Sequence, residues 1–125
     1  MAKTRRLASP SDGPAPSRPI PLRTPFWNAS QLICEAIAEW TLLEFGYNGH
    51  RRIVAPYLHG VGRRKVDLLR AVQVGGSSRS GQLGVGKLWT VAKMIDVRPT
   101  GEHFVPDDPA YNPADAAMMK IHCRV

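Results

Sequence analysis

The stretch LLEFGYNGHRRIVAP, residues 42–56, decides the fold of this 125-residue chain. Leu43, Phe45 and Tyr47 are spaced two apart, as are the side chains on one face of a β-strand. Asn48-Gly49 follows them, and this pair is a strong turn signal because both central residues of a type I′ turn have positive φ. The stretch therefore predicts a β-hairpin whose second strand ends at Pro56, which has no N–H to donate to a ladder.

The segment before the hairpin predicts a helix from Ala29 to about Trp40. Apolar residues recur at helical spacing, and Asn28 stands where a residue that caps the first turn is expected. The apolar residues are Ala29, Leu32, Ile33, Ala36, Ile37 and Trp40. Residues 1–25 are rich in proline, serine and arginine and have few apolar side chains, so we expect a disordered basic tail. Residues 26–125 would then form the single folded domain.

After the hairpin, the pattern predicts three further strands. Residues 66–74 form a nearly continuous apolar run, which is typical of a strand buried on both faces. A fourth strand is expected over residues 87–97, and a closing strand over residues 118–125, where apolar and basic residues alternate. The prolines and acids of residues 98–113 predict a long connection, with a short helical turn after Asn112. One N-terminal helix followed by about five short strands predicts a mainly β fold, a small Sm-like or SH3-like barrel.

Positive charge is concentrated in the middle of the chain. The formal net charge is +7, and residues 51–94 hold nine basic residues against the single Asp67, a net charge of +8. Such a field attracts polyanions, of which nucleic acid is the commonest. The alternative is a solvated face that only keeps the protein in solution.

The two cysteines, Cys34 and Cys123, allow one disulfide at most. They are far apart and lack Cys-x-x-Cys spacing, and free cysteine is often buried as a small hydrophobe. We therefore expect both to be reduced and structural. The N-terminus lacks the apolar stretch of a secretory signal, and no run of about 18 apolar residues is present. We expect a cytoplasmic protein that does not contact membranes.

From about residue 33 onward, the order of landmarks resembles the WYL domain of bacterial and phage proteins, including its short stand-alone members. The residues that carry the resemblance include FGYNG at 45–49, RIVAP at 52–56, LHG at 58–60, LRAVQVGGS at 69–77 and GKLW at 86–89, with Phe104 and Tyr111. Where the family has its Trp-Tyr-Leu tripeptide, this chain has Asp67-Leu68-Leu69. The resemblance implies a small barrel that senses a ligand, with nucleotides or nucleic acid as the suspected ligands.

Carried over to this chain, the resemblance implies ligand contacts from Arg52, Arg70 and Gln73. A guanidinium offers a planar fork of donors to phosphate oxygens, and a neighbouring amide can read a base edge. Tyr47 or His59 could stack on a base. The alternatives are a surface strand position for Arg52 and cross-strand packing for Tyr47. We expect Lys93 to join Arg52 and Arg70 in one pocket.

The loop at residues 75–81 has two interpretations. Its glycines free consecutive backbone amides beside the hydroxyls of Ser77 and Ser78, which could form an anion-binding nest. The loop lacks the Lys-Ser/Thr ending of a phosphate-binding Walker loop, so a plain flexible hairpin loop is the alternative.

No catalytic constellation is visible. The four histidines lack paired ligand spacing, so no metal site is predicted, and neither cysteine lies in a nucleophile motif. The chain is expected to be non-catalytic, without a cofactor, and to bind nucleic acid or an anionic small ligand. The competing hypothesis is a protein-interaction or oligomerisation scaffold that uses the residues around Met118 and Met119.

Overall fold

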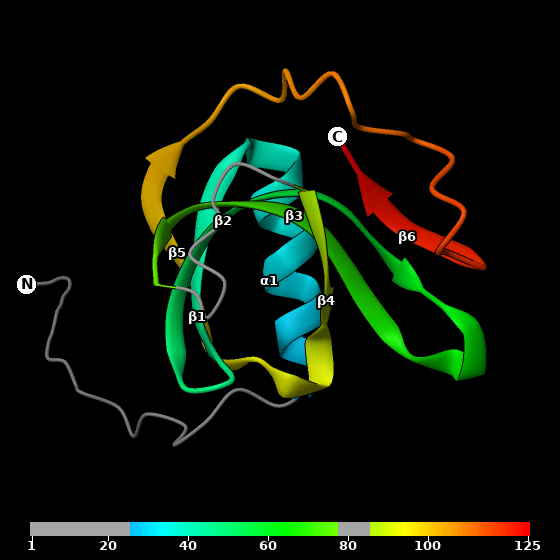
Figure 1. The fold of residues 1–125 in the computed structure, drawn as a ribbon, viewed down its shortest axis with the longest axis horizontal. Helices are drawn as coiled ribbons and strands as arrows, with labels where there is room; N and C mark the ends of the chain where they lie inside the picture. Colours follow the sequence, from blue (N-terminus) through cyan, green and yellow to red (C-terminus); the bar gives the residue numbers. More distant parts are fainter. Residues whose placement is uncertain (1–25, 78–85) are drawn as a thin grey trace, which may run out of the picture.

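The computed structural model describes residues 26–77 and 86–125 and is mainly β with one helix (Figure 1). In chain order its elements are α1 (Phe26–Glu39), β1 (Thr41–Tyr47), β2 (His50–Val61), the 3₁₀ turn η1 (Arg63–Lys65), β3 (Asp67–Gly76), β4 (Gly86–Thr90), the 3₁₀ turn η2 (Val91–Lys93), β5 (Ile95–His103) and β6 (Lys120–Arg124). The predicted fold class is confirmed at this level. The predicted N-terminal tail and Ser78 lie outside the described residues.

The helix carries the predicted apolar face but has different ends. Ile33, Ala36 and Ile37 are buried. Since α1 begins at Phe26, Asn28 lies within the helix and is not its cap. Trp40 has φ +54°, a left-handed conformation that ends the helix at Glu39 and leaves the indole 47% exposed, so its predicted place on the buried face is wrong.

The predicted hairpin is confirmed, with positive φ at both Asn48 and Gly49. The second strand does not end at Pro56, however, but continues to Val61. One edge of β2 pairs with β1 as far as Val54, and the same strand pairs with β6 from Leu58 onward. Pro56 lies between the segment of β2 that pairs with β1 and the segment that pairs with β6. Its missing N–H therefore removes no hydrogen bond from either ladder.

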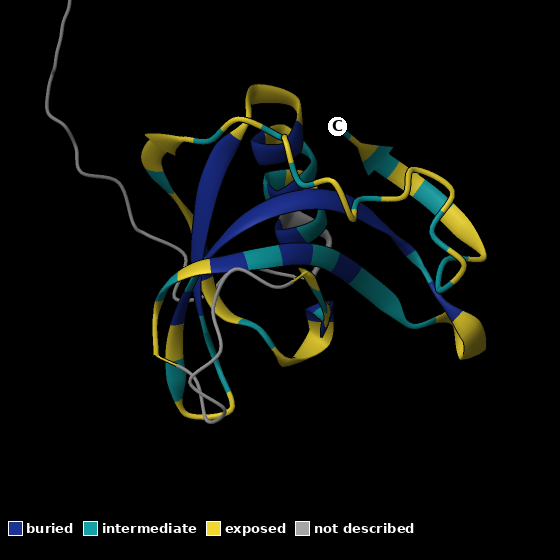
Figure 2. Ribbon diagram, turned by 45° about the horizontal axis from the view of Figure 1, so that its top comes forward, coloured by how far each residue is buried: buried dark blue, intermediate teal, exposed yellow. Residues whose placement is uncertain are grey.

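The strands form one open sheet of antiparallel pairs in the order β4-β3-β2-β1-β5, with β6 also paired to β2. Among the described strands, the two at the ends of this order, β4 and β5, do not pair with each other, so the predicted closed barrel is not confirmed. The sheet curves around α1, which contacts β1, β2, β5, β6 and η2 (Figure 1). The buried residues of β1, β2 and α1 face one another across this core (Figure 2).

The predicted strand boundaries beyond the hairpin need correction. In β3, Leu69, Ala71 and Gln73 are buried and alternate with more exposed neighbours, so the strand is not buried on both faces. The single strand predicted over residues 87–97 is two strands, β4 and β5, separated by η2. β5 then runs through Pro99 to His103, a region expected to be a connection. Proline is tolerated there because β5 is an edge strand.

The remaining segment, residues 104–119, contains turns but no helix, so the helical turn predicted after Asn112 is absent. Its aromatic residues pack back on the sheet, where Tyr57 contacts Phe104 and Tyr111 at centroid distances of 5.6 and 5.2 Å. This second cluster adjoins the main core through Val125, which packs against both. With 14 residues, α1 is too short to cross a bilayer, and the described ranges contain no other α-helix.

Cys34 on α1 and Cys123 on β6 form a disulfide, and the expectation of two reduced thiols is wrong. The two elements pack against each other, and the Cα atoms are 5.7 Å apart, within the range that disulfides take. The bond closes a sequence separation of 89 residues and attaches the C-terminal strand to the first helix.

Because the disulfide closes so long a loop, replacing both cysteines by serine is expected to lower the free energy of unfolding by about 2–4 kcal/mol. Equilibrium denaturation of Cys34→Ser/Cys123→Ser and of the oxidised wild-type protein measures the difference. A reducing agent should lower the stability of the wild-type protein and leave the variant unchanged. Equal denaturation midpoints for all samples would show that the disulfide does not stabilise the protein as expected.

Candidate functional site

Three of the predicted ligand residues meet in a buried polar network. Arg52 is 5% exposed and Gln73 is fully buried. The Arg52 guanidinium donates from Nη1 to Gln73 Oε1 at 3.3 Å, and from Nε and Nη2 to the Tyr47 carbonyl at 3.3 and 3.0 Å. The Gln73 amide in turn donates to the carbonyls of Gly75 and Ser77 at 2.9 and 3.0 Å. Arg52 is therefore neither the predicted surface residue nor a free phosphate ligand.

Aromatic rings complete the surroundings of this guanidinium. Its Cζ lies 5.8 Å from the centroid of the Tyr47 ring and 5.4 Å from that of Trp89, within the range of cation–π attraction. The Tyr47 hydroxyl accepts the backbone N–H of Thr90 at 3.0 Å, and its ring packs edge-on against Trp89. Tyr47 thus has the packing role that was the alternative to base stacking. The network joins β1, β2, β3 and β4.

Arg70 lies apart from this network and is occupied by a carboxylate. It donates to Asp115 from Nε at 2.7 Å and from Nη2 at 3.1 Å, in the bidentate geometry of strong ion pairs. The hydrogen bond from Arg70 holds the pKa of Asp115 below its usual value, against the opposing effect of burial. The pair lines a cavity of about 220 Å³ beside Tyr57 and Tyr111.

The other predicted residues are scattered. His59 is fully buried and cannot stack on a base, since its ring nitrogens contact Ser30 Oγ and the Leu68 carbonyl. The Ser77 hydroxyl contacts His50 Nδ1 at 3.0 Å. Lys93 is exposed at the end of η2, and of the two cavities described here one is lined by Arg70 and neither by Arg52 or Lys93. The single pocket expected from Arg52, Arg70 and Lys93 does not form.

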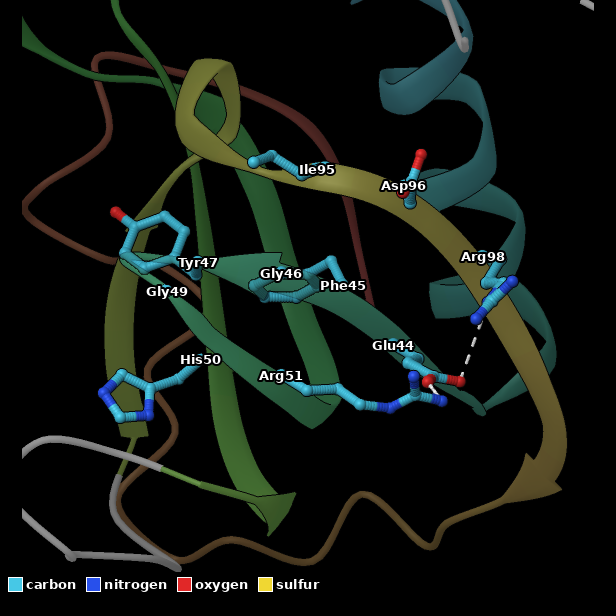
Figure 3. A pocket seen from close by; sticks show the side chains of 10 residues that line it. All are labelled: Glu44, Phe45, Gly46, Tyr47, Gly49, His50, Arg51, Ile95, Asp96 and Arg98. Atoms are coloured by element: carbon cyan, nitrogen blue, oxygen red, sulfur yellow. Dashed lines mark ion pairs between the residues drawn. The ribbon is translucent and has the colours of Figure 1, made fainter. Parts of the chain in front are cut away.

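A cavity of about 300 Å³ that the sequence did not predict lies between β1, β2 and β5 (Figure 3). The carboxylate of Glu44, from β1, lies at one end between the guanidinium groups of Arg51 and Arg98. Its distance to Arg98 Nε is 3.8 Å, and its closer partner is Arg51. The two cations share this one carboxylate, on a residue that is only 9% exposed, so it balances one of their two positive charges.

A surface that we call the basic tip comprises Arg63, Arg64, Lys65 and Lys120. The first three are exposed in η1, at the turn between β2 and β3, and Lys120 pairs with Val61 at the base of this turn. Arg64 and Lys65 have φ of +64° and +59°. Unlike Arg51, Arg70 and Arg98, none of the four has an ion-pair partner within residues 26–77 and 86–125.

Glycine is required where the basic tip meets β6. A Cβ on Gly60 would lie 2.2 Å from the carbonyl oxygen of Lys120, so only glycine lets the two strands approach this closely. Residues 63–65 belong to the basic middle of the sequence but were not among the predicted ligand residues. The available signal was the run Arg63-Arg64-Lys65 between two strand patterns.

Comparisons with known proteins place no constraint on this site: no family model, no curated protein and no solved structure matches the chain. The resemblance to the WYL domain therefore stays a prediction.

Replacing Arg52 by alanine is expected to destabilise the fold by about 2–4 kcal/mol, because it leaves the buried Gln73 amide oxygen without a donor and opens a cavity beside Trp89. The matched control is Lys93→Ala, which removes an exposed cation and should change stability by less than about 0.5 kcal/mol. Chemical denaturation followed by tryptophan fluorescence measures both. Equal stability of the two variants would show that Arg52 is not a core residue.

The Arg70–Asp115 pair predicts a specific sensitivity to acid. A carboxyl whose folded pKa is depressed contributes stability that is present above its unfolded pKa and is lost as pH falls through the lower folded value. The stability advantage of wild type over Asp115→Asn should therefore shrink below about pH 4. Melting temperatures of both proteins, measured from neutral pH to below pH 4, test this expectation. The control is Asp107→Asn, which replaces an exposed carboxylate. Parallel curves for wild type and Asp115→Asn would refute this role of the pair.

Proposed function

We propose that this protein is a non-catalytic binding module that takes single-stranded or double-stranded nucleic acid through the basic tip. The observation that carries the proposal is the exposure of four cations at one end of the sheet, without ion-pair partners among the described residues. Elsewhere in the described chain, Arg70 pairs with Asp115, and Arg51 and Arg98 share the Glu44 carboxylate. Unpaired cations are the ones that can replace the counterions of a phosphate backbone.

The shape of the basic tip favours a polyanion over a small anion. Sites for small ligands are concave and enclose most of the ligand, whereas η1 is a protruding turn whose side chains are all exposed. A free nucleotide would gain little burial there, but an extended phosphate chain can contact several side chains in succession. The concave alternative in Figure 3 is less suited to an anion, because the buried Glu44 carboxylate lies between its two arginines and would repel a second negative charge.

The backbone of the basic tip supports a functional role. Arg64 and Lys65 are non-glycine residues in the left-handed region, a conformation that costs of order 1 kcal/mol or more for each residue and is concentrated at functional sites. Two consecutive cations there contribute nothing to the core, since both are exposed. A role in binding would account for two exposed cations in this turn.

The ligand class agrees with the one that the WYL resemblance implies, while the contacts differ. We assign them to the basic tip in place of Arg52, Gln73 and Tyr47, whose hydrogen-bonding groups are engaged inside the protein. In this proposal the bent sheet around α1 is a variant of the Sm-like barrel in which the end strands stay unpaired.

The test is a fluorescence anisotropy titration with single- and double-stranded oligonucleotides at two salt concentrations. The variant Arg63→Gln/Arg64→Gln/Lys65→Gln keeps the side chains long and removes three charges. Its dissociation constant should rise at least about tenfold at low salt, and its log–log salt slope should be shallower by about 2, because fewer counterions are released. The matched control, Lys93→Gln/Arg124→Gln, removes two exposed cations outside the tip and should bind within about twofold of wild type.

Two outcomes would contradict the proposal. Wild-type affinity in the triple variant would show that the basic tip is not the contact surface. Absence of salt-dependent binding by the wild-type protein, together with self-association in light scattering, would favour the oligomerisation scaffold instead. Met119, which is 72% exposed beside β6, would then be the first residue to replace.

A further inference from the structure

A cluster of potential metal ligands lies on three adjacent strands at the base of the β2–β3 turn. His59 on β2, Asp67 on β3 and His122 on β6 each offer one ligand atom, and these three atoms all lie within 4.8 Å of one another. We propose that they form a binding site for a divalent transition-metal cation, with Zn²⁺ as the best-suited ion. The proposal is independent of the nucleic-acid proposal, since it rests on other side chains.

The strand pairing brings the cluster together. β2 pairs with β3 on one side and with β6 on the other, so residues distant in sequence become neighbours. On β6 the register passes from Cys123, opposite His59, to Ile121, opposite Gly60. His122 is therefore the extra residue of a β-bulge, a device that redirects a side chain and is over-represented near functional sites. Its ring centroid lies 5.0 Å from that of His59.

His59 has the protonation state and the orientation of a metal ligand. The Leu68 carbonyl, 2.8 Å from Nδ1, can only accept a hydrogen bond, so Nδ1 carries the proton and Nε2 holds the lone pair. An Nδ1–H donated to a carbonyl is the usual way in which metal-binding histidines are oriented. His59 Nε2 now lies 2.7 Å from Ser30 Oγ. A metal ion would either displace this hydroxyl or bind it as a further ligand.

The other two ligands already have the spacing of a zinc site. His122 Nε2 and Asp67 Oδ1 are 3.4 Å apart. Zinc bonds to nitrogen and oxygen of about 2.0–2.1 Å place two ligands of a tetrahedral ion about 3.3 Å apart. Both side chains are partly exposed, at 32% and 20%, so the ion has a path from solvent and a water molecule can complete its coordination.

The ligand set selects the class of ion. Two imidazoles and one carboxylate suit borderline metals such as zinc, whereas Mg²⁺ and Ca²⁺ prefer oxygen ligands alone. The disulfide removes both thiols of the chain from competition. The sequence predicts no metal site at these three residues because they lack local ligand spacing. Only the pairing of β6 with β2, which has no local signature, brings them together.

The test uses the oxidised full-length protein without an affinity tag, titrated with ZnCl₂ in competition with a chromophoric chelator. One equivalent should bind. His122→Ala and Asp67→Asn, both at partly exposed positions, should each weaken binding at least about tenfold. His103→Ala is the matched control, because it removes an exposed histidine from β5 outside the cluster and should leave affinity unchanged. A thiol assay confirms that the disulfide is intact.

A second readout tests His59 without replacing a buried residue. Long-range ¹H–¹⁵N spectra should show zinc-dependent shifts of the ring nitrogens of His59 and His122, while those of His50 and His103 stay in place. If zinc does not bind at one equivalent, or if His122→Ala binds as tightly as wild type, the cluster is only a histidine–aspartate ion pair beside a buried histidine. An equal loss in His103→Ala would show non-specific binding and would equally overturn the proposal.

Discussion

The structure depends on one constraint, the exchange of partners along β2. This 12-residue strand pairs with β3 from Arg52 to Val61, while its other edge pairs first with β1 and then with β6. The exchange takes place around Pro56, where no hydrogen bond is required on that edge. Because β2 pairs with β1 over its first part and with β6 over its last part, the sheet bends, and α1 fills the resulting concave face. The Cys34–Cys123 disulfide then attaches the second half to the same helix.

The two halves of β2 hold chemically different groups. Near β1 the strand buries Arg52 in a network of amide, carbonyl and aromatic partners, which is a structural use of a cation. Near β6 it buries His59 beside Asp67 and His122, close to the turn that carries the exposed cations of η1. Among the described cations of β2 and η1, Arg52 is therefore buried inside the fold, whereas Arg63, Arg64 and Lys65 are exposed. The amino-acid composition does not show which cations are buried and which are exposed.

Local patterns predicted what depends on neighbours in sequence. The spacing of Ile33, Ala36 and Ile37 identified the buried face of α1, and Asn48-Gly49 identified the hairpin turn. The features that were missed depend on distant partners. Pro56 and Pro99 are compatible with strands only because of the edges on which they lie, and nothing near Cys34 indicates that β6 will pack beside it. For the same reason, Arg52, Arg70 and Lys93, which were predicted to form one site, lie in different parts of the structure. His122 lies beside His59 only because β6 pairs with β2, and no local pattern in the sequence indicates that pairing.

The pairing of β6 with β2 is thus the claim on which the bend, the disulfide and the histidine cluster all rest. Nuclear Overhauser contacts in the full-length protein measure it directly. We expect cross-strand backbone contacts between Leu58 and Arg124 and between Gly60 and Ile121, with slow hydrogen exchange for the amides that bond across this ladder. Absence of these contacts, with rapidly exchanging amides throughout residues 120–124, would contradict it.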